Sequence, residues 1–307
     1  MPGSYRYLHY DVFTDRLFGG NQLAVLVDAR GLSGDSMQAV AKEMNFSETT
    51  FILPSERPDT DVRMRIFTPG RELPMAGHPT VGSTFALAHE QVIAAGRPQF
   101  VFGLGVGPTP VTMTWRGADL AFVWMTQSLP IFHEALSDPA RAAAALSLPA
   151  SAVVDTGTPV QVISCGVPFL FVPLATRSAV DAASVERSAL DALLAATNSG
   201  AHGVFLFSAE PGADGATVYS RMFAPELGVA EDPATGSASG PLGCYLVRHK
   251  IVPAESAAGG ILSLQGVKMG RPSHVHIAIG AGSASGDISS VRVGGTAVLA
   301  GEGVLYL

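Results

Sequence analysis

Hydrophobic and polar residues in the first third of the chain alternate with two different periods. Residues 7–13 and 23–27 are rich in β-branched and aromatic side chains, which predicts two strands joined by a glycine-containing turn. Ser33 follows, and serine is a preferred residue at the start of a helix. The hydrophobic residues after it keep the helical spacing i, i+3, i+4 and i+7: Met37, Val40, Ala41 and Met44. The pattern therefore predicts an amphipathic helix after two strands.

The alternation of strand and helix patterns continues to the C-terminus. Short β-rich runs predict further strands at residues 49–53, 62–67, 109–115, 120–125, around 162, 169–172, 204–207, 218–223, 261–264, 275–279, 291–293 and 304–307. Longer periodic segments predict helices at 79–89, in the alanine-rich stretch after Arg141, at 185–194 with Ser184 as the cap, and from Gly236 to about His249. Residues 127–130 have the pattern of a connector. This order of elements predicts an α+β protein.

A weak internal repeat indicates two similar halves. Residues 65–69, RIFTP, resemble residues 221–225, RMFAP, and a polar loop with glycine follows each copy. A helix then opens on a turn of small residues, at 76–80 in the first copy and at 233–237 in the second, whose loop is one residue longer. Two similar strand–turn–helix units can arise in any α+β protein, but we favour two pseudo-equivalent halves with facing helix N-termini.

Composition and charge exclude several classes of protein. Of the 307 residues, 47% are hydrophobic and 15% are charged, which supports a large core and excludes global disorder. The net charge of −7 comes without any run of lysine or arginine, so we expect no nucleic-acid partner. No apolar stretch approaches the roughly 20 residues that cross a bilayer, and the N-terminus lacks the order of a signal peptide. We therefore expect a soluble, cytoplasmic protein without a membrane partner.

The sequence gives no sign of a metal or cofactor site. Cys165 and Cys244 are too few for a disulfide framework and lack the spacing of metal ligands. Residues 236–240 carry alanine where a nucleophile elbow needs serine, and the glycines at 103–107 lack the dinucleotide-binding spacing. We therefore expect neither a metal nor a cofactor.

The two helix-opening turns predict a binding site for an anion. A helix N-terminus presents N–H groups that have no partner within the helix, and it carries the positive end of the helix dipole. Gly77 and Gly236 let a ligand approach the backbone closely, and Ser237 adds a hydroxyl donor. Such turns would hold a small-molecule carboxylate substrate. Ordinary helix caps explain the same residues equally well.

Three titratable residues near these segments are candidates for proton transfer or substrate binding. Glu48 is the only acid in the neutral, partly apolar run 45–51, where desolvation would raise the pKa of its carboxyl group and suit it to take and return a proton. His78 suits a hydrogen bond to substrate or a second acid or base, and Asp232 suits a helix cap or a contact with a polar substituent. Taken singly, each is explained as well by a structural or surface role.

Taken together, these motifs resemble the phenazine-biosynthesis PhzF-like family. The matching segments are YDVF at 10–13, GNQLAV at 20–25, MQ at 37–38, FSETTF at 46–51, RIFTP at 65–69, ELPMAGHPT at 72–80, EDPATGSA at 231–238, QG at 265–266 and GRPS at 270–273. Each segment is weakly specific, whereas the combination is specific for the family.

The resemblance implies the diaminopimelate-epimerase-like fold, an α+β architecture of two pseudo-symmetric halves that each wrap a mixed β-sheet around a central helix. By this likeness residues 1–127, completed by a C-terminal strand at 300–307, form one half, and residues 128–299 form the other. The active site is expected in the cleft between the halves. Family members are commonly homodimers, so we also expect a homodimer.

The resemblance also implies a reaction. The family's characterised member isomerises trans-2,3-dihydro-3-hydroxyanthranilate without a cofactor, and the glutamate that moves the proton in that enzyme matches Glu48. The residues that match His78, Asp232 and Ser237 bind or orient the substrate there. Family membership alone does not fix the substrate of this chain.

Related epimerases carry a cysteine on each helix-opening turn and use the two as opposed acid and base. We place those positions at Ala76 and Pro233, neither of which can carry a proton. This disfavours two-base racemisation and leaves a single carboxylate.

The leading hypothesis is a cofactor-independent isomerase in which Glu48 moves a proton while the turns at Gly77–His78 and Gly236–Ser237 hold the substrate carboxylate. An amino-acid epimerase or racemase on the same scaffold and a non-catalytic small-molecule-binding protein are the alternatives.

Overall fold

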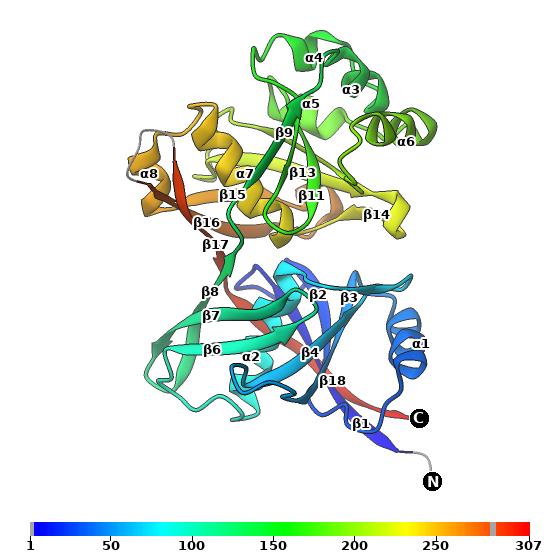
Figure 1. The fold of residues 1–307 in the computed structure, drawn as a ribbon, viewed down its shortest axis with the longest axis vertical. Helices are drawn as coiled ribbons and strands as arrows, with labels where there is room; N and C mark the ends of the chain where they lie inside the picture. Colours follow the sequence, from blue (N-terminus) through cyan, green and yellow to red (C-terminus); the bar gives the residue numbers. More distant parts are fainter. Residues whose placement is uncertain (1–2, 283–286) are drawn as a thin grey trace. The chain divides into compact units, whose positions relative to one another are not determined.

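The computed structural model describes residues 3–282 and 287–307 of the chain (Figure 1). The chain forms two compact units. The first comprises Met1–Thr126 and Val293–Leu307, and the second comprises Gln127–Arg292. None of the helices in the described residues is long and apolar enough to cross a membrane.

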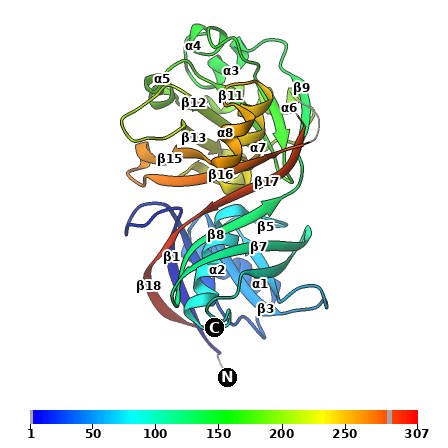
Figure 2. The same ribbon diagram turned by 90° about the vertical axis from the view of Figure 1, so that its left-hand side faces the viewer.

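The first unit is a mixed β-sheet with two helices. Its strands are β1 (Ser4–Val12), β2 (Asn21–Leu26), β3 (Glu48–Pro54), β4 (Val62–Phe67), β5 (Glu72–Leu73), β6 (Gln99–Leu104), β7 (Gly107–Arg116), β8 (Asp119–Gln127) and β18 (Ala297–Tyr306). Its helices are α1 (Gly34–Met44) and α2 (Gly77–His89). The strands pair in the order β18–β1–β2–β3–β4–β6–β7–β8, with β5 beside β4. The pairs β2–β3 and β4–β6 are parallel, and the others are antiparallel. Figure 2 shows β18, in dark red, alongside β1.

The second unit is a mixed β-sheet with helices on both faces. Its strands are β9 (Ile131–Ala135), β10 (Gln161–Ser164), β11 (Pro168–Pro173), β12 (Val204–Ser208), β13 (Val218–Ala224), β14 (Val229–Asp232), β15 (Ile261–Gln265), β16 (Ser273–Ala281) and β17 (Ile288–Gly295). Its α-helices are α3 (Ala140–Ala145), α4 (Ser151–Val154), α5 (Arg177–Ala182), α6 (Arg187–Ala196), α7 (Gly236–Arg248) and α8 (Ala254–Gly259), and two 3₁₀ turns lie at Pro225–Leu227 and Val267–Met269. The strands pair in the order β9–β10–β11–β12–β13–β15–β16, with β14 beside β13. The pairs β11–β12 and β13–β15 are parallel.

The two sheets share one topology, which confirms the predicted repeat. From β1 to β6 and from β10 to β15, antiparallel, parallel, antiparallel and parallel pairs follow one another. The 13-residue helices α2 and α7 follow the short strands β5 and β14. The ion pairs repeat as well: Arg65 binds Glu72 and Arg221 binds Glu231, each through two nitrogen–oxygen contacts of 2.6–2.9 Å.

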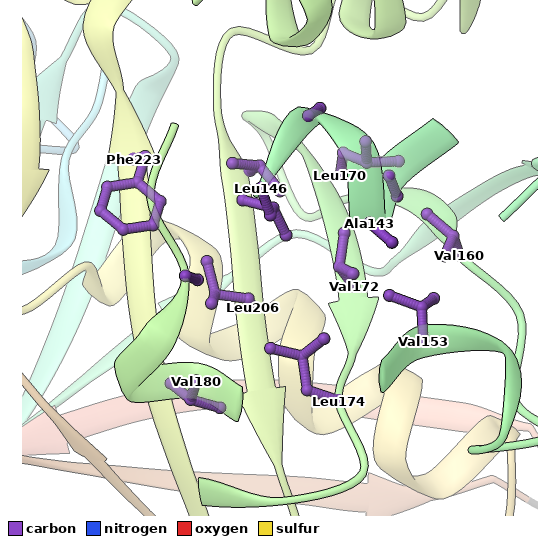
Figure 3. Packing of buried hydrophobic residues seen from close by; sticks show 14 of the residues in the cluster. Ala143, Leu146, Val153, Val160, Leu170, Val172, Leu174, Val180, Leu206 and Phe223 are labelled. Carbon is purple, nitrogen blue, oxygen red and sulfur yellow. The ribbon is translucent and has the colours of Figure 1, made fainter. Parts of the chain in front are cut away.

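The sheet of the second unit is buried on both faces because alternate residues of its strands enter different cores. On β11 and β12, Leu170 and Leu206 pack into a core with helices α3 to α6. Their neighbours Phe171 and Phe205 pack into a second core with α7. Figure 3 shows part of the first core, with Leu146 of the segment after α3 among the strand residues. This two-sided burial holds α7 against one face of the sheet.

In the first unit, α1 and α2 pack on opposite sets of strand residues. Met37 of α1 clusters with Phe51 of β3, and Ser33 caps α1 as predicted by accepting a hydrogen bond from the Ser36 N–H. On α2, a Cβ atom built on Gly82 would lie 2.6 Å from side-chain atoms of both Val12 and Leu23. Helix α2 therefore lies very close to β1 and β2, and this fixes where its first turn sits relative to those strands.

Several predicted element boundaries are wrong. The sequence patterns do not predict strands β5, β6, β9 and β14; β5 and β14 are very short, and β9 has no buried residue and no alternation of buried and exposed positions. The cap of α6 is Glu186 rather than Ser184, because the Glu186 carboxylate accepts hydrogen bonds from two N–H groups of the first turn. Gln127 ends β8 instead of opening a connector.

Candidate active site

Glu48 is the first residue of β3 and faces helix α2. The chain reaches β3 from α1 through Asn45, whose left-handed backbone (φ 52°) ends the helix. Strand residues alternate between faces, so Glu48 shares a face with Thr50, whose hydroxyl lies 2.9 Å from the Ser83 hydroxyl of α2. The Glu48 side chain is 14% exposed. The side chain is therefore mostly enclosed, and a small part of it is exposed.

His78 is the second residue of α2 and lies against Glu48. The distance from His78 Nε2 to Glu48 Oε2 is 3.3 Å, and the His78 side chain is only 3% exposed. On the other side of the ring, His78 Nδ1 lies 3.2 Å from the side-chain nitrogen of Asn21. Asn21 is buried and opens β2. The ends of β2, β3 and α2 thus bring together an amide, a carboxyl group and an imidazole.

Burial determines the charge of the imidazole. Desolvation lowers the pKa of His78 to about 3, against the smaller opposing effect of a hydrogen bond to the backbone of Gln22. At neutral pH the ring is uncharged, so its contact with Glu48 is not an ion pair. A neutral imidazole donates one hydrogen bond and accepts another. His78 is therefore a hydrogen-bonding group at neutral pH, and Glu48 is the group in this contact that is suited to carry a proton.

The first turn of α2 is buried and lacks a cap from any described side chain. No side chain in the described part of the chain caps this helix at its Ala76 position. Gly77 has no side chain to shield the backbone, and the Thr80 hydroxyl turns back to donate to the Ala76 carbonyl at 2.8 Å. The N–H groups of a helix start attract carboxylates and phosphates.

In the second unit, Asp232 belongs to a buried hydrogen-bond network at the start of α7. The Thr235 hydroxyl donates to Asp232 Oδ2 at 2.6 Å. The Gln265 amide donates to the Asp232 carbonyl at 2.7 Å and accepts from the Thr235 N–H at 3.1 Å. Helix α7 then begins at Gly236, followed by the half-buried Ser237, and no described side chain caps its start.

The strand registers align the two units residue by residue and show that their chemistry differs. Phe67 pairs with Thr49, and its equivalent Phe223 pairs with Val204, so the second unit has Gly203 where the first has Glu48. Because α2 begins at Gly77 and α7 at Gly236, Ser237 is the equivalent of His78. The second unit therefore has no counterpart of the Glu48–His78 pair.

The polar network of the second unit has no counterpart in the first. Register makes Leu73 the equivalent of Asp232 and Leu104 the equivalent of Gln265. Counting back from the helix starts, Ala76 is the equivalent of Thr235.

The predicted equivalence of Ala76 with Pro233 is therefore wrong. Pro233 corresponds to Pro74, and the second loop is longer than the first by more than the single residue that the sequence comparison gave. The correction leaves the chemistry unchanged, since neither alanine nor threonine serves as an acid or base at neutral pH.

The predicted site residues fall into two groups. Glu48, Gly77 and His78 lie together in the first unit, and Asp232, Gly236 and Ser237 lie together in the second. The predictions assigned no role to Asn21, Thr235 and Gln265, although each stands in a segment that matches the family motifs. Their side chains hydrogen-bond to other site residues, and a motif by itself does not reveal such contacts.

The chain is similar in sequence to several named isomerases. A family model described as phenazine biosynthesis-like protein matches residues 10–303. The trans-2,3-dihydro-3-hydroxyanthranilate isomerase of Pseudomonas aeruginosa is 38% identical over 305 residues, which cover 99% of this chain and 100% of the relative. An uncharacterized isomerase of Mesorhizobium japonicum is 34% identical over 305 residues, with 98% of both chains covered.

Solved structures share the fold. A phenazine biosynthesis protein of the PhzF family from Bacillus anthracis matches with a TM-score of 0.86 at 26% identity, over 99% of this chain and 100% of that one. A probable proline racemase from Agrobacterium radiobacter matches with a TM-score of 0.68 over 97% of this chain and 92% of that one; at 14% identity this shows the fold alone. These likenesses confirm the predicted fold class.

Proposed function

The chain belongs to the phenazine biosynthesis-like protein family and is an isomerase, and we propose that it moves a proton on a small carboxylate-bearing substrate without a cofactor. The observation that carries this proposal is the contact between Glu48 and His78 beside the uncapped first turn of α2. A carboxylate can take a proton from carbon and return it elsewhere, provided that the substrate is held in place while the proton is on the enzyme.

In the proposed mechanism each group of the first unit has one role. Glu48 takes and returns the proton. The neutral ring of His78, with Nδ1 against Asn21 and Nε2 against Glu48, orients the Glu48 carboxyl group, and the N–H groups of Gly77 and His78 receive the substrate carboxylate. A carboxylate held at a helix start draws electron density from the neighbouring carbon, which makes a proton on the adjacent carbon framework easier to remove.

The residues of the second unit are also proposed to bind substrate. Asp232 accepts a hydrogen bond from an amino or hydroxyl group, while Gly236 and Ser237 donate hydrogen bonds from the start of α7. The substrate proposed first is trans-2,3-dihydro-3-hydroxyanthranilate, because the Pseudomonas aeruginosa relative is named for its isomerisation. That compound carries carboxylate, amino and hydroxyl groups, to which these residues can form hydrogen bonds.

The proposal is tested by turnover of this compound by protein from which bound small molecules have been removed. Protein dialysed against a chelator and passed through gel filtration is incubated with the substrate, and the product is identified by mass spectrometry and NMR. We expect full conversion at the rate given by untreated protein. No conversion would reject the substrate, and conversion only after a metal or organic cofactor is restored would reject cofactor independence.

A two-base epimerase or racemase is the rival on the same scaffold. Such an enzyme needs a second proton carrier. The helix-opening positions that could supply it are Ala76 and Thr235, and the second unit has Gly203 in place of Glu48; none of these side chains can serve as that carrier. We therefore expect no proton–deuterium exchange at Cα when amino acids are incubated with the protein in D₂O. Exchange at Cα with inversion would favour the epimerase.

A further inference from the structure

The hydrogen bonds around Asp232 can run in one direction only. A main-chain carbonyl accepts and a main-chain N–H donates, so the contacts of Gln265 with the Asp232 carbonyl and the Thr235 N–H fix which end of its amide is nitrogen. That nitrogen also lies 3.0 Å from Thr235 Oγ1 and must donate to it. The hydroxyl hydrogen of Thr235 is then directed at Asp232 Oδ2, 2.6 Å away.

Burial keeps this direction in place. Asp232, Thr235 and Gln265 are all buried, and the Gln265 side chain spans from the end of β15 to the turn before α7. Reversing the Thr235 hydroxyl would leave two buried donors facing each other and a carboxylate oxygen without this donor, which is costly in a low-dielectric interior. The Asp232 carboxylate is thereby held in one orientation as a hydrogen-bond acceptor.

The equivalent turn of the first unit has no such network. The equivalent residues of the first unit are Leu73, Ala76 and Leu104, and none of them forms a polar network. The two turns nevertheless close in the same way. A Cβ atom built on Gly105 would lie 2.8 Å from the Pro74 backbone, and one built on its equivalent Gly266 would lie 2.6 Å from the Pro233 backbone. The close contact between glycine and proline therefore forms in the first unit without polar side chains, so the network is not required for that contact.

We propose that Thr235 and Gln265 are positioning residues, which hold Asp232 as an acceptor for an N–H or O–H group of the substrate. The inference rests on the proposed function and extends it from a residue that contacts substrate to the two residues that hold that residue in place. It also gives Thr235 a role that differs from proton transfer, because its hydroxyl hydrogen is engaged by Asp232.

Kinetics of three variants test the positioning role. Thr235→Val keeps the size of the side chain but removes the hydroxyl, and Thr235→Ser keeps the hydroxyl. Thr84→Val is the matched control, since Thr84 is a buried threonine of α2 whose hydroxyl donates to the Thr80 carbonyl. Loss of a hydrogen bond to a charged group predicts a KM about ten- to a hundredfold higher for Thr235→Val, with kcat largely kept.

The controls separate positioning from other effects. We expect Thr235→Ser to restore KM and Thr84→Val to leave it unchanged. Gln265→Met removes the amide that sets the hydroxyl direction and should raise KM as well, which provides a second route if Thr235→Val does not fold. A fall in kcat at unchanged KM in Thr235→Val, or equal effects of the valine substitutions at 235 and 84, would overturn the inference.

Two measurements without turnover distinguish failure of this inference from failure of the proposed reaction. By calorimetry, wild type should bind 2-aminobenzoate more tightly than benzoate, and Thr235→Val should lose the preference; wild type without a preference for the amino compound contradicts the inference. In crystal structures of the ligand-free variants, the Asp232 carboxylate should turn away from residue 235 in Thr235→Val and keep its place in Thr235→Ser. A carboxylate that keeps its place in both would overturn the inference even if the enzyme acts on another substrate.

Discussion

The ring of His78 lies 3.3 Å from the Glu48 carboxyl group and is almost fully buried. Burial and distance together indicate different roles for the two residues. Desolvation keeps the imidazole neutral, so it acts by hydrogen bonding, while the partly exposed side chain of Glu48 is the candidate to exchange a proton with substrate. The contact itself follows from the positions of the two residues at the ends of β3 and α2.

The low pKa of His78 predicts a dependence of stability on pH that one substitution removes. The ordinary pKa is 6.5 and the folded value is about 3. Between these values the unfolded chain binds a proton that the folded chain does not, so the free energy of unfolding falls as the pH is lowered from 6.5 toward 3. The slope from this residue is about 1.4 kcal/mol per pH unit. His78→Gln lacks this contribution.

Urea denaturation at several pH values between 7 and 4 measures the difference in unfolding free energy between wild type and His78→Gln. We expect this difference to shrink as the pH falls below 6.5. His89→Gln, on the same helix but 46% exposed, is the matched control and should change the pH dependence less. A difference between wild type and His78→Gln that does not vary with pH would contradict burial as the cause.

Among the elements, α2 depends on the absence of a side chain at Gly82. Alanine normally stabilises a helix by about 1 kcal/mol relative to glycine. At this position, however, the added Cβ would lie 2.6 Å from atoms of Val12 and Leu23. We expect Gly82→Ala to lower the free energy of unfolding by about 1–3 kcal/mol, because overpacking outweighs propensity. Chemical denaturation of Gly82→Ala measures this change in unfolding free energy. Ala88→Gly, on the same helix, is the control that measures helix propensity alone. A Gly82→Ala variant more stable than wild type would contradict the close packing.

The repeated ion pairs offer a matched comparison between the two sheets. The Arg221 and Glu231 side chains are 9% and 18% exposed, whereas those of Arg65 and Glu72 are 21% and 42% exposed. Removing the glutamate leaves a buried arginine without its counter-ion in the first case and a more hydrated arginine in the second. Glu231→Gln should therefore cost roughly 3 kcal/mol of unfolding free energy, and Glu72→Gln about 1 kcal/mol or less. Thermal or chemical denaturation of the two variants measures which one loses more unfolding free energy. Equal losses would show that burial does not determine the contribution of these ion pairs.

For the molecule as a whole, periodicity and the short repeat predict most of the architecture. The repeated RIFTP-like segments fall on β4 and β13, which hold equivalent places in the two sheets. Strand β9 escapes prediction because its side chains are not alternately buried. The site is only partly predictable from the sequence. Glu48 and His78 are recognised by residue type, whereas the roles of Thr235 and Gln265 depend on hydrogen bonds between residues far apart in the sequence. The equivalence of Ala76 with Pro233 is wrong because the two loops differ in length by more than the one residue that the sequence comparison gives.

The family resemblance also predicts the oligomeric state of the whole molecule, a homodimer. Light scattering coupled to size-exclusion chromatography should give a mass of twice the 31.7 kDa of one chain. A single-chain mass across the micromolar range would contradict it. The result does not bear on the assignment of Glu48, since both members of the Glu48–His78 contact come from one unit of one chain.

The central claim is that Glu48 carries the proton, and kcat of Glu48→Gln tests it most directly. Glutamine keeps the size of the side chain but cannot take a proton, so the account predicts a loss of kcat of roughly a hundred- to ten-thousandfold, with KM and thermal stability close to those of wild type. The assay is turnover of trans-2,3-dihydro-3-hydroxyanthranilate by both proteins under identical conditions. A Glu48→Gln enzyme that turns over at the wild-type rate would contradict the account.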